Sequence, residues 1–120
     1  MTLICGLPNA GKTTYSQRFN EVIHLDDFPR NKFLNCNAYV STQEDCVVEG
    51  IYNLRCRRLR LLESYHGSAP RICIWIDTPL EERLKRETRG RPSSVINSGF
   101  QPPTLDEGWD EIIIVRNNYE

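Results

Sequence analysis

The sequence contains no long hydrophobic run, and this absence excludes a membrane-spanning helix. Its most apolar stretches, 72–76 and 112–115, are four or five residues long, whereas a helix needs about 20 apolar residues to cross a bilayer. No basic segment precedes an apolar one at the N-terminus, so we expect no secretory signal peptide. We therefore expect a cytoplasmic protein with no membrane partner.

The sequence also has no excess of one charge and no compositional bias. Its 120 residues include 15 Lys and Arg against 16 Asp and Glu, for a net charge of −1, and 39% of the residues are hydrophobic. Balanced charge argues against a protein that coats nucleic acid by bulk electrostatics, but it is compatible with a local basic cleft. The ordinary composition and the length predict a single globular domain over residues 1–120.

Metal-ligand motifs are missing as well. None of the five cysteines belongs to a Cys-x-x-Cys pair, and the two histidines are not spaced with cysteines as zinc ligands. Three of the cysteines lie within apolar runs. We therefore expect reduced, mostly buried thiols and no zinc site.

What the chain does have is a regular alternation of short apolar stretches and helical ones. The predicted strands span residues 2–5, 22–25, 46–49, 71–77 and 111–115. The predicted helices span residues 12–20, 53–65 and 80–91. Thr78 is the expected N-cap of the last helix, and residues 28–44 predict a loop or a short irregular helix. The alternation predicts a three-layer α/β fold.

Residues 6–13 match the phosphate-loop pattern Gly-x-x-x-x-Gly-Lys-Thr in full. The glycines let backbone N–H groups point at phosphate oxygens, Lys12 places a charge between the β- and γ-phosphates, and the Thr13 hydroxyl ligates Mg²⁺. The motif lies between a predicted strand and a predicted helix, so we predict ATP and Mg²⁺ as cofactors, with Thr13 as the metal ligand. The residues expected to contact the nucleotide are Gly6, Pro8, Asn9, Ala10, Gly11, Lys12, Thr13 and Thr14.

The motifs of two other classes of phosphate-loop protein are missing. There is no Asn-Lys-x-Asp for guanine, as in switch GTPases, and the third predicted strand ends in Glu49-Gly50, not in the Asp-Glu usual in motor ATPases. The second predicted strand ends in Asp26-Asp27, at the edge of the sheet where the phosphate loop is expected. Asp26 there can accept the proton of a hydroxyl that attacks the γ-phosphate. The alternative is that both aspartates cap the following turn.

Arginines recur every two or three residues after the fourth predicted strand. Such arginines can close over a transferring phosphoryl group and neutralise its charge. We expect Arg86 and Arg89 to act in catalysis together with Lys12 and Asp26. The alternative is a solvated helix face with Glu–Arg pairs. The basic residues in question are Arg83, Arg86, Arg89 and Arg91.

Three weaker signals have a structural explanation, and two of them also have a functional one. Trp75 is expected in the core, while Trp109 either stacks on adenine or packs within its loop. Four arginines in the helix of residues 53–65 form either a basic patch for a polynucleotide backbone or a solvated helix face. They are Arg55, Arg57, Arg58 and Arg60.

Several of these segments together resemble the polynucleotide-kinase-like family of phosphate-loop kinases, which includes the 5′-hydroxyl polynucleotide kinases of phage and bacteria and small AAA-type predicted kinases. The resemblance covers nearly the whole chain. The segments that carry it are the phosphate loop, the strand ending in Asp26-Asp27, residues 47–53 with Arg57-Arg58, the arginine-rich segment, and residues 100–110.

This resemblance implies five parallel strands in the order 2-3-1-4-5 and transfer of the γ-phosphate of ATP to the 5′-hydroxyl of a nucleic acid. It implies that Asp26 is the general base and that Arg86 and Arg89 are lid arginines. It also implies an acceptor side made of Asp27, Arg30, Glu49 and Asn53.

The sequence departs from this family in the acceptor half. Only 18 residues separate Asp27 from Cys46, where members of the family usually have more. Three alternatives therefore stay open. The acceptor is a small molecule such as a nucleoside or sugar, a second copy or a partner completes the acceptor site, or the chain is a nucleotide-binding module without transfer activity inside a complex.

Overall fold

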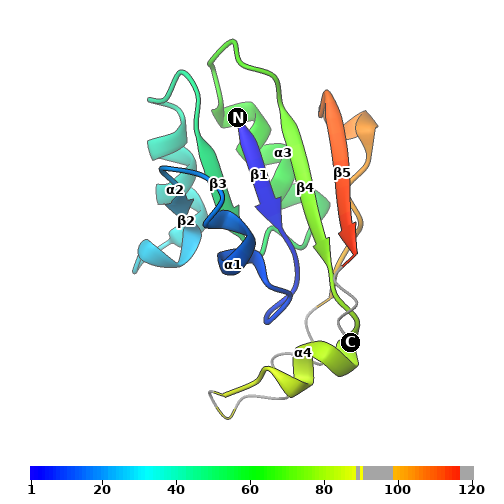
Figure 1. Ribbon diagram of the computed structural model, residues 1–120. Coiled ribbons are helices and arrows are strands. Elements are labelled where there is room, and N and C mark those ends of the chain that lie inside the picture. Colours follow the sequence, from blue (N-terminus) through cyan, green and yellow to red (C-terminus); the bar gives the residue numbers. More distant parts are fainter. Residues whose placement is uncertain (89, 91–98, 117–120) are drawn as a thin grey trace.

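The computed structural model describes residues 1–88, 90 and 99–116. Its centre is a five-stranded, all-parallel sheet in the order β2-β3-β1-β4-β5. This order and the helices on both faces confirm the expected three-layer α/β fold (Figure 1). The strands are β1 (Thr2–Cys5), β2 (Ile23–His24), β3 (Val47–Gly50), β4 (Ile72–Asp77) and β5 (Glu111–Arg116).

The helices lie at three places around the sheet. α2 and α3 cover one face, α1 covers part of the other, and α4 lies beyond the carboxyl ends of the strands (Figure 1). In the part of the chain that the structure describes, no helix has the length and apolar content needed to cross a membrane. The helices are α1 (Lys12–Ser16), α2 (Lys32–Val40), α3 (Arg55–Ser64) and α4 (Leu80–Lys85), with 3-10 turns η1 (Leu25–Asp27) and η2 (Leu105–Glu107).

The alternation of side chains along the strands makes two hydrophobic cores. In β1, Leu3 and Cys5 pack with α2 and α3, whereas Ile4 packs with Tyr15 and Phe19, which follow the phosphate loop. All of the carboxyl ends lie at one edge because the strands are parallel. That edge therefore brings together the loops that follow β1, β2, β3 and β4.

The segment between β2 and β3 forms a regular nine-residue helix, α2, where the sequence predicted a loop or a short irregular helix. Cys36 and Val40 are four residues apart and fully buried, and Phe33 is half-buried on the same side. The helix begins after Asn31, whose φ of 43° is in the left-handed region. A side of Phe, Cys and Val is apolar enough to hold the helix against the sheet.

Two predicted helices are shorter than expected, and one predicted cap is wrong. α1 ends at Ser16 and α4 ends at Lys85. Pro79, not Thr78, is the N-cap residue of α4. The Thr78 hydroxyl instead donates to the carbonyl of Ala10 at 2.6 Å, so this side chain joins β4 to the loop that follows β1.

Candidate phosphate-binding site

The loop between β1 and α1 needs glycine at two positions. A Cβ on Gly6 would lie 2.8 Å from the carbonyl oxygen of Ile76 on β4, so a larger residue would displace backbone. Gly11 has a φ of 105°, in the left-handed region that favours glycine. Asn9 also has a left-handed φ, of 64°. The chain therefore turns sharply and closely against the sheet, as a phosphate loop must.

Lys12 folds back over this loop. Its ammonium donates to the carbonyl of Leu7 at 3.0 Å, and the Ala10 amide donates to the same carbonyl at 3.1 Å. Thr13 and Thr14 follow at the exposed start of α1. The ammonium and the threonine hydroxyl thus lie at the same end of the loop, and their chemistry fits a phosphate group and a hard cation respectively.

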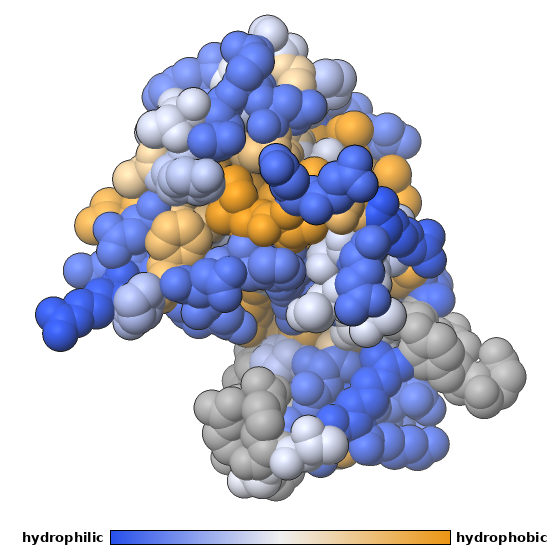
Figure 2. All heavy atoms as spheres, turned by 60° about the vertical axis from the view of Figure 1, so that its left-hand side comes forward, coloured by the Kyte–Doolittle hydropathy of each residue, from blue (hydrophilic) through white to orange (hydrophobic). Residues whose placement is uncertain are grey.

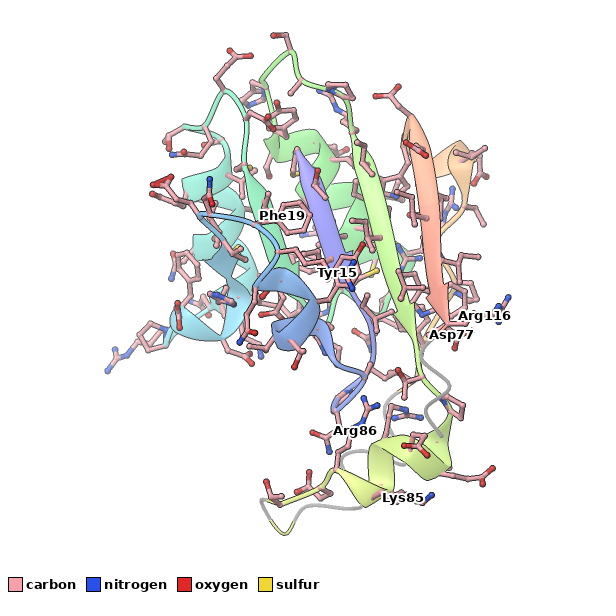
Figure 3. All side chains as sticks on the ribbon, in the orientation of Figure 1. Tyr15, Phe19, Asp77, Lys85, Arg86 and Arg116 are labelled. Carbon is pink, nitrogen blue, oxygen red and sulfur yellow. The ribbon has the colours of Figure 1, made fainter. Side chains whose placement is uncertain are left out.

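The segment containing α4 is attached to the tip of the loop through Asn9. The Asn9 amide donates to the Arg83 carbonyl at 3.2 Å and to a carboxylate oxygen of Glu87 at 2.9 Å. Arg86 donates to the Asn9 carbonyl at 3.1 Å and lies between α4 and the loop (Figure 3). The structure therefore brings Arg86 to the phosphate loop, while Arg89 and Arg91 lie outside the described residues.

Arg83, on the same helix, has a structural position. Its side chain is buried and its Nε donates to the Thr78 carbonyl at 3.3 Å. Burial lowers the pKa of Arg83, and nearby Asp77 acts in the opposite direction. This arginine therefore helps to fix α4 against the end of β4.

The two aspartates after β2 lie at the same edge of the sheet as the loop. Asp26 is on η1 with a side chain that is 87% exposed, and it forms an ion pair with Lys32 at 3.1 Å. β2 is two strands from β1 in the sheet, which is about 10 Å at the usual strand spacing. Asp27 is exposed and borders a separate shallow pocket beside β2. Arg30 is exposed too, and its carbonyl accepts from Asn35.

A histidine that the sequence analysis did not select lies close to Glu49. The Nδ1 of His24 is 2.7 Å from an Oε1 of Glu49, and the Glu49 side chain is only 10% exposed. The two residues are opposite each other in the register of β2 and β3, and Ile4 of β1 is next to Glu49. The signal for this pair was available, since each residue lies at or one before the end of its predicted strand.

Asn53 turns toward the C-terminal part of the chain. Its amide donates to the Gly99 carbonyl at 2.8 Å, and its own carbonyl accepts from the Gln101 amide at 2.8 Å. Asn53 thereby joins the loop after β3 to the segment before β5. The Asn53 side chain therefore bonds to backbone and is separate from the residues gathered around the phosphate loop.

The arginines of α3 differ from one another, which corrects the prediction for Arg58. That side chain is fully buried and forms two 2.9 Å hydrogen bonds with the carboxylate of Glu107. It is therefore part of neither a basic patch nor a solvated face. Arg55 pairs with Asp106 at 3.1 Å. Only Arg57 and Arg60 border an open groove.

The two tryptophans take structural positions. Trp109 is 4% exposed, and its indole N–H donates to Glu107 at 2.9 Å. It therefore packs within its loop, and the alternative that it stacks on adenine is wrong. Trp75 is half-buried and stacks on Phe100 with ring centres 5.2 Å apart. All five cysteines are free thiols, and three of them are buried.

Known structures support the fold. The crystal structure of a sugar kinase from Janibacter sp. HTCC2649, solved without ligand, is similar with a TM-score of 0.72. The two chains are 16% identical, and the match covers 96% of this chain and 83% of that chain. No protein-family model matches the chain, and no curated protein matches it at a significant level. At 16% identity this likeness establishes the fold.

Proposed function

We propose that this chain is an ATP-dependent kinase that transfers the γ-phosphate to a hydroxyl acceptor. One observation carries the proposal. The complete phosphate-loop motif is folded at the carboxyl end of β1, with the Lys12 ammonium held over the loop. The similarity of the fold to that of a protein named a sugar kinase supports the same class of reaction.

In this proposal the loop amides and Lys12 hold the β- and γ-phosphates of ATP. Thr13 offers a hydroxyl oxygen, which is the kind of ligand that Mg²⁺ prefers. When bound, Mg²⁺ would neutralise charge on the phosphates. Arg86, already in contact with the loop, neutralises charge that develops on the transferring group.

Asp26 is the proposed general base. It accepts the proton of the acceptor hydroxyl, whose oxygen bonds to the γ-phosphorus as the bond from that phosphorus to the bridging oxygen of ADP breaks. The exposed position of Asp26 leaves it accessible to an incoming acceptor. Glu49 with His24, Asp27, Arg30 and Asn53 are proposed to shape the acceptor side.

The acceptor that we favour is the 5′-hydroxyl of a nucleic acid, because the resemblance to the polynucleotide-kinase-like family covers nearly the whole chain. A small hydroxyl acceptor such as a sugar is the second candidate, since the structural neighbour is named a sugar kinase. A module that binds nucleotide without transferring phosphate is the candidate from another class.

The experiment is transfer of labelled γ-phosphate from ATP to a panel of 5′-hydroxyl DNA, 5′-hydroxyl RNA, nucleosides and sugars. We expect label at an oligonucleotide 5′ end, and none with Lys12→Ala, which controls for contaminating kinase. Label on small acceptors alone would move the assignment to a metabolite kinase. ATP binding without any transfer would refute the kinase proposal in favour of the binding module.

The role of Asp26 is tested with Asp26→Asn. A general base contributes about 10²- to 10⁴-fold to the rate of such a reaction, so turnover should fall by this order while the affinity for ATP stays unchanged. The comparison is Asp27→Asn, one residue further along the same exposed turn, which should affect KM for the acceptor and lower turnover far less than Asp26→Asn, because Asp27 is proposed to shape the acceptor side and not to take the proton. Equal losses in the two variants would contradict the assignment of Asp26.

A further inference from the structure

A groove of about 570 Å³ lies between α2 and α3. It is on the face of the sheet opposite α1, and the view from the side of β2 and α2 shows an apolar band across an otherwise hydrophilic surface (Figure 2). Three of the lining residues are cationic and none is acidic. The groove is lined by Asn31, Lys32, Phe33, Leu34, Asn37, Leu54, Cys56, Arg57 and Arg60.

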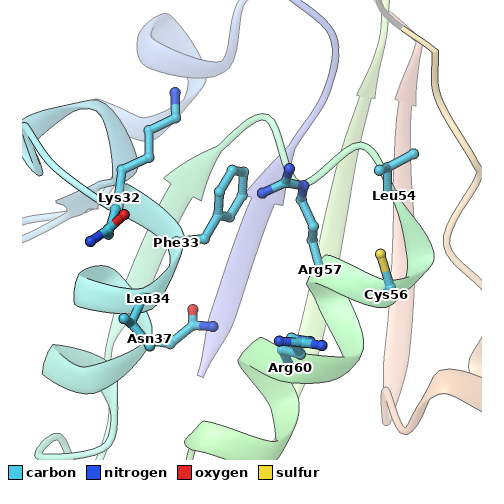
Figure 4. A pocket seen from close by; sticks show the side chains of 9 residues that line it. Lys32, Phe33, Leu34, Asn37, Leu54, Cys56, Arg57 and Arg60 are labelled. Atoms are coloured by element: carbon cyan, nitrogen blue, oxygen red, sulfur yellow. The ribbon is translucent and has the colours of Figure 1, made fainter.

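Within the groove, Arg57 is held in a defined orientation. Its guanidinium carbon lies 3.8 Å from the centre of the Phe33 ring, and the two side chains point toward one another from α3 and α2 (Figure 4). The Phe33 ring in turn packs edge-on against Tyr52, which is fully buried. A planar cation fixed on an aromatic ring is a ready surface for stacking with a further flat ring.

The four arginines of α3 divide into two that are paired with carboxylates and two that have no such pair among the described residues. Arg55 and Arg58 are neutralised by Asp106 and Glu107. Within residues 1–88, 90 and 99–116, no carboxylate forms an ion pair with Arg57 or with Arg60, which lies one turn further along the helix. Two cations on the same side of α3 therefore face the groove.

The groove also leads to the proposed general base. Lys32 is one of its lining residues and forms the 3.1 Å ion pair with Asp26. The groove is therefore one side chain away from Asp26, and an acceptor whose hydroxyl reaches Asp26 can extend along it. At the rim, the side chain of Leu34 is exposed at 69% and offers an apolar contact to a ring.

We infer that the α2–α3 groove binds the single-stranded nucleic acid that follows the acceptor hydroxyl. A base stacks on the guanidinium of Arg57, and Arg60 contacts a backbone phosphate. Single-stranded nucleic acids are bound in this manner, by planar side chains for bases and cations for phosphates. This inference rests on the proposed function for the identity of the acceptor, and it deepens that function because a neutral sugar would leave both cations unpaired.

The test is direct binding, measured by fluorescence anisotropy without ATP, of a short 5′-hydroxyl DNA strand labelled at its 3′ end. Arg57→Gln should weaken binding about tenfold, from the loss of one stacking interaction and one charge. Arg60→Gln should lower the slope of log affinity against log salt by about 0.7, the value for one phosphate contact on a single strand. Arg60 is exposed, so its variant stays informative even where Arg57→Gln is poorly folded.

A matched control comes from Arg18, which lies over the ring of Tyr15 at 4.3 Å. Arg18→Gln removes the same charge from the same kind of pair outside the groove, and should bind the strand as the unaltered protein does. Equal weakening by Arg18→Gln and Arg57→Gln would overturn the inference, because strand binding would then depend only on the net charge of the protein.

Phe33 is a positioning residue in this inference, because it acts through Arg57. Phe33→Leu keeps an apolar side chain but removes the ring, and should weaken strand binding several-fold with an unchanged salt slope. Phe33→Tyr should restore the affinity. An unchanged affinity in Phe33→Leu would overturn this role.

Failure of the inference and failure of the proposed function give different results. Lys12→Ala should bind the strand normally but transfer nothing. In a transfer assay, Arg57→Gln should raise KM for the oligonucleotide and leave KM for ATP unchanged. Strand binding that depends on Arg57 without any transfer would refute the kinase alone, and transfer insensitive to Arg57 and Arg60 would refute the groove alone.

Cys56 provides a second readout inside the groove, since it is an exposed thiol among the lining residues. The oligonucleotide should slow its alkylation by iodoacetamide, measured by peptide mass spectrometry. An abasic strand should protect less, and inorganic phosphate or a neutral sugar should not protect. Protection by the sugar and not by the strand would overturn the inference and assign the groove to a small acceptor.

Discussion

Removing one member of the buried ion pair between Arg58 and Glu107 is expected to destabilise the fold strongly. Arg58 also donates to the Tyr52 carbonyl at 2.9 Å, and Trp109 donates to Glu107 at 2.9 Å. The pair thus joins α3, the loop after β3 and η2. Among the described residues, every buried side-chain nitrogen and oxygen has a hydrogen-bond partner, so removing one member leaves the others buried without one.

Glu107→Gln tests this contribution because it keeps the shape of the side chain and removes its charge. Breaking a buried pair costs about 3–5 kcal/mol, a large part of the about 5–15 kcal/mol that stabilises a typical domain. The free energy of unfolding is measured by urea denaturation at pH 7, followed by tryptophan fluorescence. A loss below about 1 kcal/mol would refute the reasoning.

Two controls separate the charge from general disruption. Arg58→Met combined with Glu107→Leu should recover the part of the loss that comes from an uncompensated charge, but not the part that comes from the Tyr52 carbonyl and the Trp109 indole N–H, which lose their partners in this variant too. Asp106→Asn alters the neighbouring exposed pair with Arg55, whose side chains are 73% and 41% exposed, and should cost less than about 1 kcal/mol.

The same pair predicts an acid dependence of stability. Burial alone would raise the pKa of Glu107, but its hydrogen bonds with Arg58 and Trp109 outweigh burial and lower that pKa below the ordinary value of 4.5. A lowered pKa in the folded state contributes stability above the unfolded pKa, and this stability is lost as pH falls through the folded pKa. The unaltered protein should therefore lose stability below about pH 4.5 more steeply than Glu107→Gln.

Three further predictions concern the phosphate loop and the thiols. Gly6→Ala places a Cβ 2.8 Å from a carbonyl of β4 and should abolish ATP binding in a calorimetric titration, whereas Gly99→Ala, whose Cβ has no described atom within 4 Å, should bind normally. Thr78→Val removes the hydroxyl that donates to the Ala10 carbonyl and should cost about 1 kcal/mol of stability; Thr78→Ser should behave as the unaltered protein in the same urea denaturation. With a colorimetric thiol reagent, exposed Cys56 should react first and the three buried cysteines only on unfolding.

Much of the fold could be predicted from the sequence because its signals are local. The apolar runs gave all five strands within a residue or two, and the glycine-rich motif placed a phosphate loop after the first. Helix ends were less predictable. α1 ends at Ser16 because the chain continues as tighter turns, in which the amides of Gln17, Arg18 and Phe19 each bond to the carbonyl three residues earlier.

α2 was predicted only as one of two alternatives, a loop or a short irregular helix, because its apolar side is short and includes a cysteine. Three asparagines and a nearby proline made the segment from 28 to 44 look like a loop, although Cys36 behaves as a small apolar residue when buried. The weak prediction of this helix affected the prediction of function as well as that of structure. Phe33 and Lys32 lie on this helix and line the groove, so the groove could not be predicted without the helix.

The four arginines of α3 show where prediction from local sequence must stop. Arg55 and Arg58 are three residues apart and share one side of the helix, and Arg57 and Arg60 share another. The pattern contains two equivalent basic sides and no indication of which one is buried. The side that carries Arg55 and Arg58 is the one that is paired. Its partners are Asp106 and Glu107, which lie 51 and 49 residues further along the chain. The second side is left facing the groove, so the candidate acceptor surface is defined by where distant carboxylates fold.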